Sequence, residues 1–376
     1  MKILITGGAG FIGSHTADAL IAEGHEVRIL DNLQAAVHPK GKPAYLHPKA
    51  EFIRGDVRDA EAWCRALKGV EAVYHLAAYQ DYLTDFSTFF SVNAVSTALL
   101  YELLVAEPNL HRVQKVIVAA SQAVMGEGRY VCKHCDGKMF FPEIRLETQL
   151  ANGQWEHHCP ECADPLQWLP SDETVIKPCN QYALSKHSQE QIAIQLGRRY
   201  EIPSVVMRYS IVQGPRQSFY NAYSGAMRIF ALSLYFHRAP MIYEDGKQVR
   251  DFVNIQDVVD ANLRVLQTPE ADYQVFNVGG GKAWTVAQFY GALQNQVGVH
   301  VEAKMGGYYR FGDTRHIFSD TGKLRALDWM PKRSVQDSIQ AYWDYLNAAQ
   351  EKDDILAYAE KHMRQLNVIR KSEHGS

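Results

Sequence analysis

Two side chains that can move a proton stand one helical turn apart. Tyr182 and Lys186 are the first and last residues of the segment YALSK, and a spacing of four residues places both on one face of a helix. A free tyrosine, with a pKa of about 10, is a poor base at neutral pH, but an adjacent ammonium favours the phenolate and lowers that pKa. Ser121 follows a short apolar run and can hold a substrate oxygen together with the tyrosine. Ser121, Tyr182 and Lys186 are therefore the candidate catalytic residues.

A glycine-rich turn near the N-terminus predicts a dinucleotide site. Gly7, Gly10 and Gly13 lie in TGGAGFIG, between a predicted strand and a predicted helix. Glycines there allow a tight turn and let the backbone approach a pyrophosphate, which the free N–H groups and dipole of the helix N-terminus bind. Asp31 ends the next strand, and its carboxylate can accept hydrogen bonds from both ribose hydroxyls while repelling the 2′-phosphate of NADP. The pattern favours NAD over NADP; the alternative is a tight turn without a ligand.

Short apolar runs alternate with longer helical patterns in the first half of the chain. This alternation predicts right-handed βαβ units and a parallel sheet covered on both faces. The predicted strands are 2–6, 26–30, 71–75, 115–119 and 203–207, and the predicted helices include 11–22, 60–68 and 93–105. The expected fold class is α/β, with a doubly wound parallel (Rossmann) sheet.

Two segments depart from this alternation and suggest how the chain is divided. We expect the Rossmann domain to span 1–207, interrupted by an inserted module at 130–177. Residues 208–350 are expected to form mainly a smaller C-terminal domain. Residues 351–376 are charged and helical in composition, which predicts a surface helix followed by a frayed end.

Four of the six cysteines form two pairs within the inserted module. Cys132 and Cys135 are separated by two residues, as are Cys159 and Cys162, and 23 residues lie between the pairs. Two such turns can place four thiolates tetrahedrally around a structural Zn²⁺, giving a zinc-ribbon-like module. Redox-active disulfides or fortuitous pairs are the alternatives. The remaining cysteines, Cys64 and Cys179, and the nearby histidines His134, His157 and His158 are not expected to bind metal.

Composition excludes several classes of function. The 376 residues carry a formal net charge of −3, with 47% hydrophobic and 22% charged residues, as is ordinary for a globular protein. Near-neutrality argues against a nucleic-acid binder that relies on bulk charge. No run of apolar residues suggests a transmembrane helix, and no secretory signal precedes the first strand. We therefore expect a cytoplasmic protein without membrane or nucleic-acid partners.

The motifs, taken in order, resemble a known family. They are TGGAGFIG, Asp31-Asn32, GDV, HLAA, Asn93, SQAVMG, YALSK, RYSIVQGPRQ, RDFVNIQDV, FNVGG and RFGDTRH. From residue 1 to about 340, excluding the cysteine insert, the chain resembles the extended short-chain dehydrogenase/reductase family of nucleotide-sugar epimerases and dehydratases. Within that family, the chain resembles dTDP-L-rhamnose 4-epimerase-like proteins, some of which carry a similar four-cysteine insert between the serine and the tyrosine.

This resemblance implies ligands and site residues. It implies NAD in the N-terminal domain, a nucleoside diphosphate sugar in the C-terminal domain, and transient oxidation of the sugar by the catalytic residues. The candidate cofactor residues are Gly7, Gly10, Phe11, Ile12, Gly13, Asp31, Asn32, Asp56, Val57, Leu76, Ala77, Ala78, Asn93, Tyr182 and Lys186. The candidate substrate residues are Gln80, Ser121, Arg250 and Arg315. Guanidinium groups suit the diphosphate, although each arginine can instead belong to a surface ion pair, and Asp56 and Val57 can mark only a strand-end turn.

Departures from the family pattern reduce the number of reactions that this chain is expected to catalyse. Gln122 and Ala123 stand where dehydratases of this family carry an acidic pair, so elimination of water lacks a proton carrier. Epimerisation needs none, because a 4-keto intermediate can rotate and take hydride back on its other face. Ile211 and Met125 replace an asparagine and a tyrosine that are usual in the family. We expect an epimerase acting at C4; the alternatives are a 4-ketosugar reductase, a dehydratase, or a non-catalytic NAD-sensing protein.

Apolar residues on two predicted helices suggest an assembly. The helices 93–105 and 182–196 carry more apolar residues than one covered face requires, namely Val95, Leu99, Leu100, Leu103, Ile192 and Ile194. The resemblance suggests that both helices pair with their symmetry mates in a homodimer. The alternative is that these residues only cover the sheet.

Overall fold

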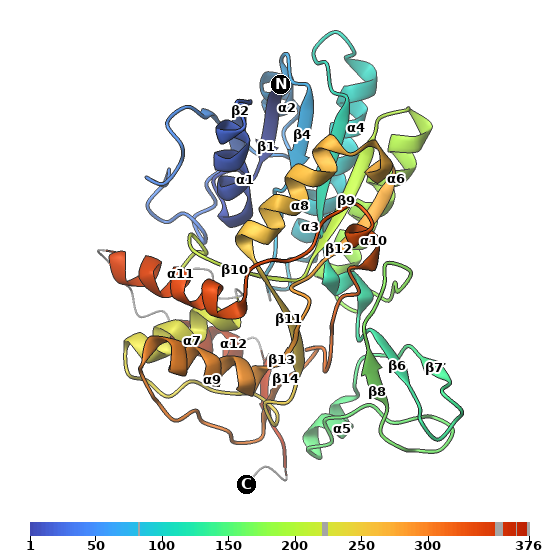
Figure 1. Ribbon diagram of the computed structural model, residues 1–376, viewed down its shortest axis with the longest axis vertical. Coiled ribbons are helices and arrows are strands. Elements are labelled where there is room, and N and C mark those ends of the chain that lie inside the picture. The colour runs from blue at the N-terminus through green and yellow to red at the C-terminus, as the bar shows by residue number, and fades with distance from the viewer. Residues whose placement is uncertain (82, 220–224, 350–355, 366, 374–376) are drawn as a thin grey trace.

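The computed structural model describes residues 1–376 except 82, 220–224, 350–355, 366 and 374–376. A seven-stranded parallel sheet, in the order β12-β9-β5-β4-β1-β2-β3, forms the upper half of the molecule (Figure 1). Its strands are β1 (Lys2–Thr6), β2 (Glu26–Asp31), β3 (Glu51–Arg54), β4 (Ala72–His75), β5 (Lys115–Ser121), β9 (Ser204–Tyr209) and β12 (Gln274–Val278). The predicted doubly wound α/β fold is confirmed.

Helices cover both faces of this sheet. The helices α1 (Phe11–Ala22) and α8 (Ile255–Gln267) pack on one face, where Leu20 and Val265 belong to one fully buried core. The opposite face is covered by α2 (Ala60–Leu67), α4 (Ser96–Ala106) and α6 (Gln181–Arg199), with Trp63 and Leu100 in a second core. Two short elements precede α4: α3 (Phe86–Phe89) and the π-helix η1 (Phe90–Val95). Two single-turn 3₁₀ helices, η2 (Gln122–Met125) and η3 (Pro269–Ala271), follow β5 and α8.

Judged by length and composition only, the helical segment Phe86–Ala106 could cross a membrane. Such a segment was not expected from the sequence. In the structure it is a core element of the Rossmann domain. Leu100, Tyr101 and Leu104 are buried against the sheet and its neighbouring helices. On its outer side, Val95 is 58% exposed. The segment is strongly apolar because one of its faces is buried in the core and another face also carries apolar side chains.

The C-terminal domain is built around a small sheet and a third core. The strands β10 (Ile211–Gln213), β11 (Val249–Asn254) and β13 (Ala283–Thr285) lie side by side, with α7 (Ala226–Tyr235), α9 (Val286–Val297) and α11 (Val335–Ala348) packed around Phe230, Phe289 and Tyr342. Ile211 contributes to this core.

The domain boundaries differ from the expectation in two places. The expected boundary assigned everything after residue 207 mainly to the C-terminal domain, but the chain returns to the Rossmann sheet at α8 and β12, and α10 (Gly322–Arg325) adds Leu324 to the same core. Within the described part of the expected tail, α12 (Leu356–Gln365) is followed by β15 (Ile369–Lys371), which pairs antiparallel with β14 (Tyr308–Arg310). Residues 374–376, where the frayed end was expected, lie outside the described residues. Residues 351–355 lie outside the described residues.

The inserted module is a separate small sheet at the lower right of Figure 1. Its strands β6 (Arg129–Val131), β7 (Met139–Phe140) and β8 (Gln167–Leu169) are antiparallel in the order β7-β6-β8, and α5 (Glu147–Ala151) lies beside them. The module leaves the Rossmann domain just after β5 and returns just before α6. It therefore joins the strand that ends at Ser121 to the helix that carries Tyr182.

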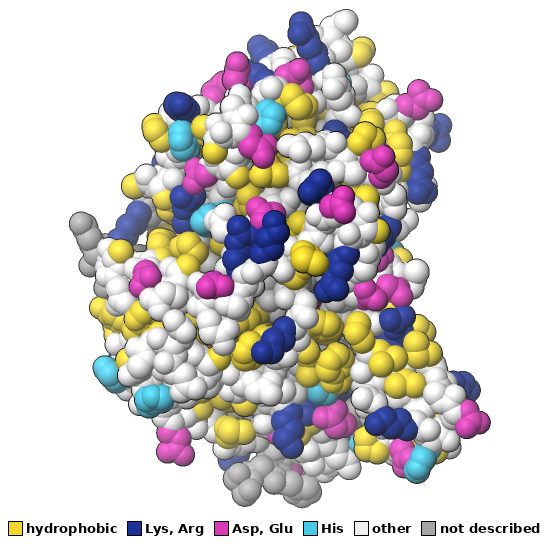
Figure 2. Space-filling view, in the orientation of Figure 1, with side chains coloured by type: hydrophobic (Ala, Val, Ile, Leu, Met, Phe, Trp, Pro, Cys, Tyr) yellow, Lys and Arg dark blue, Asp and Glu magenta, His cyan; other side chains and the backbone are white. Residues whose placement is uncertain are grey.

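Charge is mixed over the visible surface, where basic and acidic side chains are interspersed (Figure 2). The same view shows apolar side chains gathered where the insert meets the body of the molecule. The insert is thus packed against its neighbours rather than suspended on a linker.

Candidate active site

The glycine turn after β1 has the close backbone contacts that a pyrophosphate site requires. Gly7 has a φ of 67°, and a Cβ there would lie 2.8 Å from the Ala77 backbone. A Cβ on Gly13 would lie 2.4 Å from the Gly7 carbonyl oxygen. Gly10 is the N-cap of α1 and provides no capping side chain, so the first N–H groups of the helix, at Phe11 and Ile12, face the turn. This geometry fits a dinucleotide.

Asp31 lies beside that turn at the end of β2. Its two carboxylate oxygens accept hydrogen bonds from the Ala9 N–H at 3.0 Å and the Leu33 N–H at 2.8 Å, which fix the carboxylate at the sheet edge. Each oxygen can accept a further bond, as ribose recognition requires. The adjacent Asn32 donates to Asp56 at 3.0 Å, so the two segments predicted to flank the adenosine lie together.

The segments after β3 and β4 are held in place by side-chain hydrogen bonds. The Val57 carbonyl accepts from the Trp63 indole at 2.7 Å. The Arg58 guanidinium, by hydrogen bonding to Asp56, lowers the pKa of that carboxyl to about 2. Leu76, Ala77 and Ala78 pass directly over the glycine turn, and Thr6 receives the N–H groups of Leu76 and Ala77, each at 3.2 Å.

Asn93 sits between the loop after β4 and the catalytic helix. Its amide is fully buried, accepts from the Tyr79 N–H at 2.8 Å, and donates to the Tyr79 carbonyl at 3.0 Å and to the Ser185 hydroxyl at 2.9 Å. These bonds make it a brace for α6 within the predicted cofactor region. Gln80 is exposed next to this brace.

The three candidate catalytic residues come from two adjoining elements. Ser121 ends β5, and its Oγ accepts from the Ala123 N–H at 3.2 Å as the cap of a short 3₁₀ turn. Tyr182 is half-buried in the first turn of α6. Lys186 is fully buried one turn later and donates from Nζ to the Ala119 carbonyl at 2.7 Å and to Gln189 Oε1 at 2.9 Å. The end of β5 and the start of α6 are thereby joined. Burial lowers the pKa of Lys186 to about 7.

The two arginines that were predicted to bind the diphosphate have different surroundings in the structure. Arg315 is completely buried, and its five N–H donors all go to the carboxylates of Glu156, Glu244 and Asp245. In this arrangement it has no donor left for a phosphate. Within the described part of the chain, Arg250 instead donates to three carbonyl groups, those of Val249, Thr314 and Arg315.

Sequence reasoning missed a third guanidinium, that of Arg310. It is paired with Asp313, lies 5.1 Å from the ring centre of Tyr243 and remains 28% exposed. The pKa of the Arg250 guanidinium is lowered mainly by burial, and the nearby positive charge of Arg310 lowers it further. Arg310 lies in the same RFGDTRH motif as Arg315.

The four cysteines predicted to bind metal come together. Cys132 Sγ lies 3.5 Å from Cys162 Sγ, and Cys135 Sγ lies 3.7 Å from Cys159 Sγ. All four sulfur atoms lie within 4.8 Å of one another. A tetrahedral zinc with Zn–S bonds of about 2.3 Å requires sulfur separations of about 3.8 Å. The donor set and its spacing therefore fit one tetrahedral ion.

Comparison with known proteins agrees with this geometry. The sequence matches the NAD dependent epimerase/dehydratase family over residues 3–138 and 160–279. The chain belongs to that family. The match stops at residue 279, and its internal gap, 139–159, lies inside the insert. The family resemblance of the motifs is confirmed.

This chain is similar to several nucleotide-sugar epimerases over nearly the whole length of both proteins. It is 33% identical to the dTDP-L-rhamnose 4-epimerase of Burkholderia thailandensis, covering 90% of this chain and 93% of that one. It is similar to the UDP-glucose 4-epimerase of Thermotoga maritima, whose structure contains UDP-glucose, with 29% identity, a TM-score of 0.75 and 93% and 100% of the chains covered. The Thermus thermophilus UDP-glucose 4-epimerase, solved with NAD, gives 26% identity, a TM-score of 0.70 and the same coverage.

The buried Lys186 should make the free energy of unfolding of this epimerase/dehydratase family member depend on pH. Its pKa is about 7 in the folded chain and about 10.5 unfolded, so between these values the unfolded chain holds one more proton. Folding stability should therefore rise with pH over this range, by about 1.4 kcal/mol per pH unit. Lys186→Met should lack this slope when urea unfolding is measured at pH 7 and pH 9.

The exposed Lys49→Met serves as the matched control and should keep the wild-type slope. A Lys186→Met variant with an unchanged slope would show that the amine stays charged when buried.

Proposed function

We propose that this protein is an NAD-dependent nucleotide-sugar 4-epimerase acting on a nucleoside diphosphate sugar. The observation that carries the proposal is the Ser121, Tyr182 and Lys186 constellation beside a dinucleotide turn, on a chain similar to named 4-epimerases. The relatives are named for dTDP- and UDP-sugars, so the ligand class is a nucleoside diphosphate joined to a sugar.

The chain's own residues handle the proton at the sugar's 4-oxygen. The Tyr182 phenolate accepts the hydroxyl proton as the carbon is oxidised and returns it after the ketosugar has turned over. The Ser121 hydroxyl holds the same oxygen, and Lys186 in its protonated form holds positive charge behind the phenol. Bound NAD supplies a reversible hydride acceptor. The residues that hold it are the glycine turn, Asp31 and the segment after β4.

The residues that follow Ser121 do not support elimination of water. Gln122 is a buried amide and Ala123 carries no proton-transferring group. A dehydratase needs an acid and a base close to this position, and the serine here is followed by neither. Return of the hydride to the opposite face of the ketosugar requires only the residues that are present.

The diphosphate is bound by Arg250 and Arg310. The carbonyls of Val249, Thr314 and Arg315 occupy three donors of Arg250 and leave two N–H groups for an anion. Arg310 stands beside it with a partly exposed guanidinium. Arg250, which makes no ion pair among the described residues, and Arg310, which pairs with Asp313, present two adjacent guanidinium groups that a dianionic diphosphate can bridge.

The insert binds one structural zinc, and the chain forms a homodimer in the cytoplasm. Four thiolates with tetrahedral spacing and no disulfide among the described cysteines support the metal. The exposed Val95 and Leu184, on adjoining helices, support a shared apolar interface.

The first prediction concerns the proton carrier. Tyr182→Phe should bind NAD normally, because it leaves the glycine turn intact, but its turnover should fall by at least about a hundredfold. Turnover can be followed by NMR of the sugar, with Tyr200→Phe, at the exposed residue that caps the C-terminus of α6, as the control. Activity of Tyr182→Phe within tenfold of wild type would remove the phenol from this role.

The second prediction concerns the metal. Elemental analysis of purified protein should give close to one zinc per chain, and Cys159→Ser should lose the zinc and most activity while retaining NAD. Cys64→Ser, which alters a cysteine outside the cluster, should change neither. A zinc-free variant with normal turnover would contradict a structural role for the ion.

The third prediction concerns assembly. Wild-type protein should sediment as a dimer at micromolar concentration. Replacing both Val95 and Leu184 by glutamate should give a monomer, because charge would be buried at the interface. Leu146→Glu, at a 68% exposed site on the insert, should leave the dimer intact. A monomeric wild type would contradict the proposal.

A further inference from the structure

The insert and the C-terminal domain are joined by buried charges rather than by a simple apolar contact. Arg145 of the insert makes a two-pronged ion pair with Glu244, with N–O distances of 3.0 and 2.9 Å, and both side chains are only 1% exposed. Glu244 also accepts from Arg315 at 2.9 Å. Glu156, again from the insert, binds the other side of the Arg315 guanidinium and pairs with His316 at 2.9 Å.

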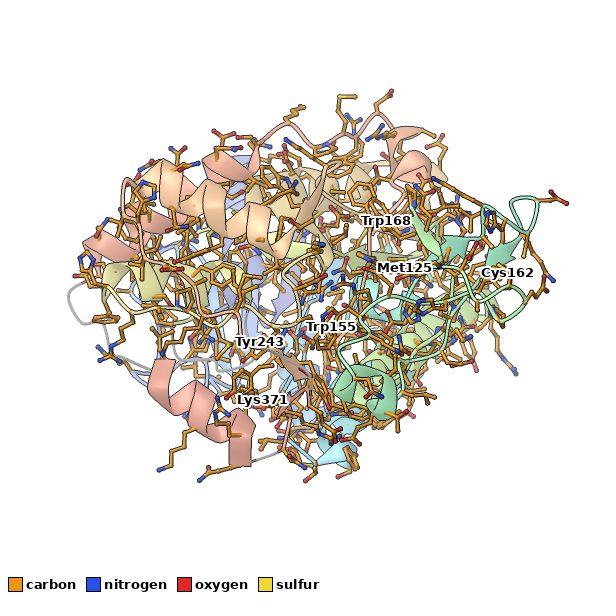
Figure 3. The ribbon with its side chains drawn as sticks, turned by 90° about the horizontal axis from the view of Figure 1, so that it is seen from below. Met125, Trp155, Cys162, Trp168, Tyr243 and Lys371 are labelled. Atoms are coloured by element: carbon orange, nitrogen blue, oxygen red, sulfur yellow. The ribbon has the colours of Figure 1, made fainter. Side chains whose placement is uncertain are left out.

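The cysteine cluster anchors the part of the insert that makes these contacts. Two successive residues reach out of the insert: Glu156 binds Arg315, and His157 Nε2 lies 3.0 Å from a Glu127 carboxylate oxygen. Just before them, the Trp155 carbonyl accepts from Arg145 within the insert. Two residues after His157, the chain enters the cluster at Cys159. Figure 3 shows Trp155 and Tyr243 at the junction with the C-terminal domain, while Cys162 lies at the outer end of the insert.

Aromatic rings extend the same junction. The Trp168 ring lies at 29° to that of His316, with ring centres 6.3 Å apart, and Tyr130 packs edge-on against His157 at 5.1 Å. Tyr130 belongs to the same small core as Cys132 and Cys159. The metal-binding core and the His316 side of the C-terminal domain therefore share one packed contact.

The segment held in this way is the one that presents the two anion-binding arginines. The carbonyls of Thr314 and Arg315 orient the Arg250 guanidinium, at 2.8 and 3.0 Å. Asp313 orients the Arg310 guanidinium at 2.7 Å, and its own carbonyl accepts from Arg145 of the insert at 2.8 Å. Residues 313–316 thus have the insert on one side and both arginines on the other.

We propose that the four-cysteine insert positions the diphosphate site: Arg145 and Glu156 hold residues 313–316 through Glu244 and Arg315, so that Arg250 and Arg310 face the substrate's phosphates. This inference rests on the proposed function. It assigns Arg145, Glu156 and Arg315 as positioning residues that do not touch the substrate. A buried charge network specifies orientation more strictly than an apolar contact, because each partner left unpaired is costly.

The test measures binding of a free nucleoside diphosphate, which requires no turnover. Glu156→Ala removes two of the five contacts of Arg315 at a partly exposed position, so the variant should fold. We expect its affinity for UDP and dTDP to fall at least about tenfold in calorimetric titration, with NAD content unchanged. In sugar turnover, KM should rise by a similar factor while kcat stays within about threefold.

Two further variants define the result. Arg145→Lys keeps a positive charge but cannot make the two-pronged pair, and should also weaken binding of the nucleoside diphosphate. Glu161→Ala removes a carboxylate of the insert that, among the described residues, pairs with the exposed Lys138, and this variant should bind like wild type.

The outcomes separate this inference from the proposed function. Wild-type protein that binds neither UDP nor dTDP would overturn the proposed function. Wild-type binding that Glu156→Ala and Arg145→Lys both retain within twofold would overturn only the positioning role. Equal losses in all three variants would also overturn it, because they would indicate a general effect of altering the insert.

Discussion

The hydrogen bond from the buried Lys186 ammonium to the Ala119 carbonyl joins the two elements on which the active site is built. It ties the first turns of α6 to the end of β5, so that Tyr182 and Ser121 stand at one edge of the sheet. Burying an amine there lowers its pKa and costs stability. The bond from Lys186 Nζ to Gln189 Oε1 and the bond that Asn93 donates to the Ser185 hydroxyl keep the helix in place. Burial of Lys186 therefore lowers stability, but it fixes the Tyr182 phenol, the Ser121 hydroxyl and the Lys186 amine relative to one another.

That relation is maintained although a whole module is inserted between the two elements. Ser121 and Tyr182 are 61 positions apart, and the intervening chain could have been a mobile loop. Instead it folds around four cysteines and packs on the C-terminal domain through Arg145, Glu156 and a buried Glu244. The insert and the C-terminal domain therefore meet around one guanidinium, that of Arg315, whose backbone N–H also donates to Glu127 just before the insert.

The parts of this structure that were predictable from sequence are those set by local chemistry. The glycine turn, the helix starting at Phe11 and the cysteine pairs follow from short-range spacing, and they lie where the spacing placed them. The return of α8 and β12 to the large sheet was not predictable in this way, because strand order depends on contacts between distant segments. Likewise, nothing local distinguishes Arg315 from Arg310; the carboxylates that enclose Arg315 come from positions 70 and 159 residues away. The β15 strand escaped notice because its partner β14 is equally short and distant.

The central claim is that hydride leaves the sugar's C4 and returns to the same carbon on the other face. It is tested most directly with purified protein, no added cofactor, and UDP- and dTDP-hexoses that carry deuterium at C4, followed by NMR. The account predicts inversion at C4 with the deuterium retained and no net release of NADH. Exchange of that deuterium for solvent hydrogen, or turnover only when NADH or NADPH is supplied and consumed, would contradict it.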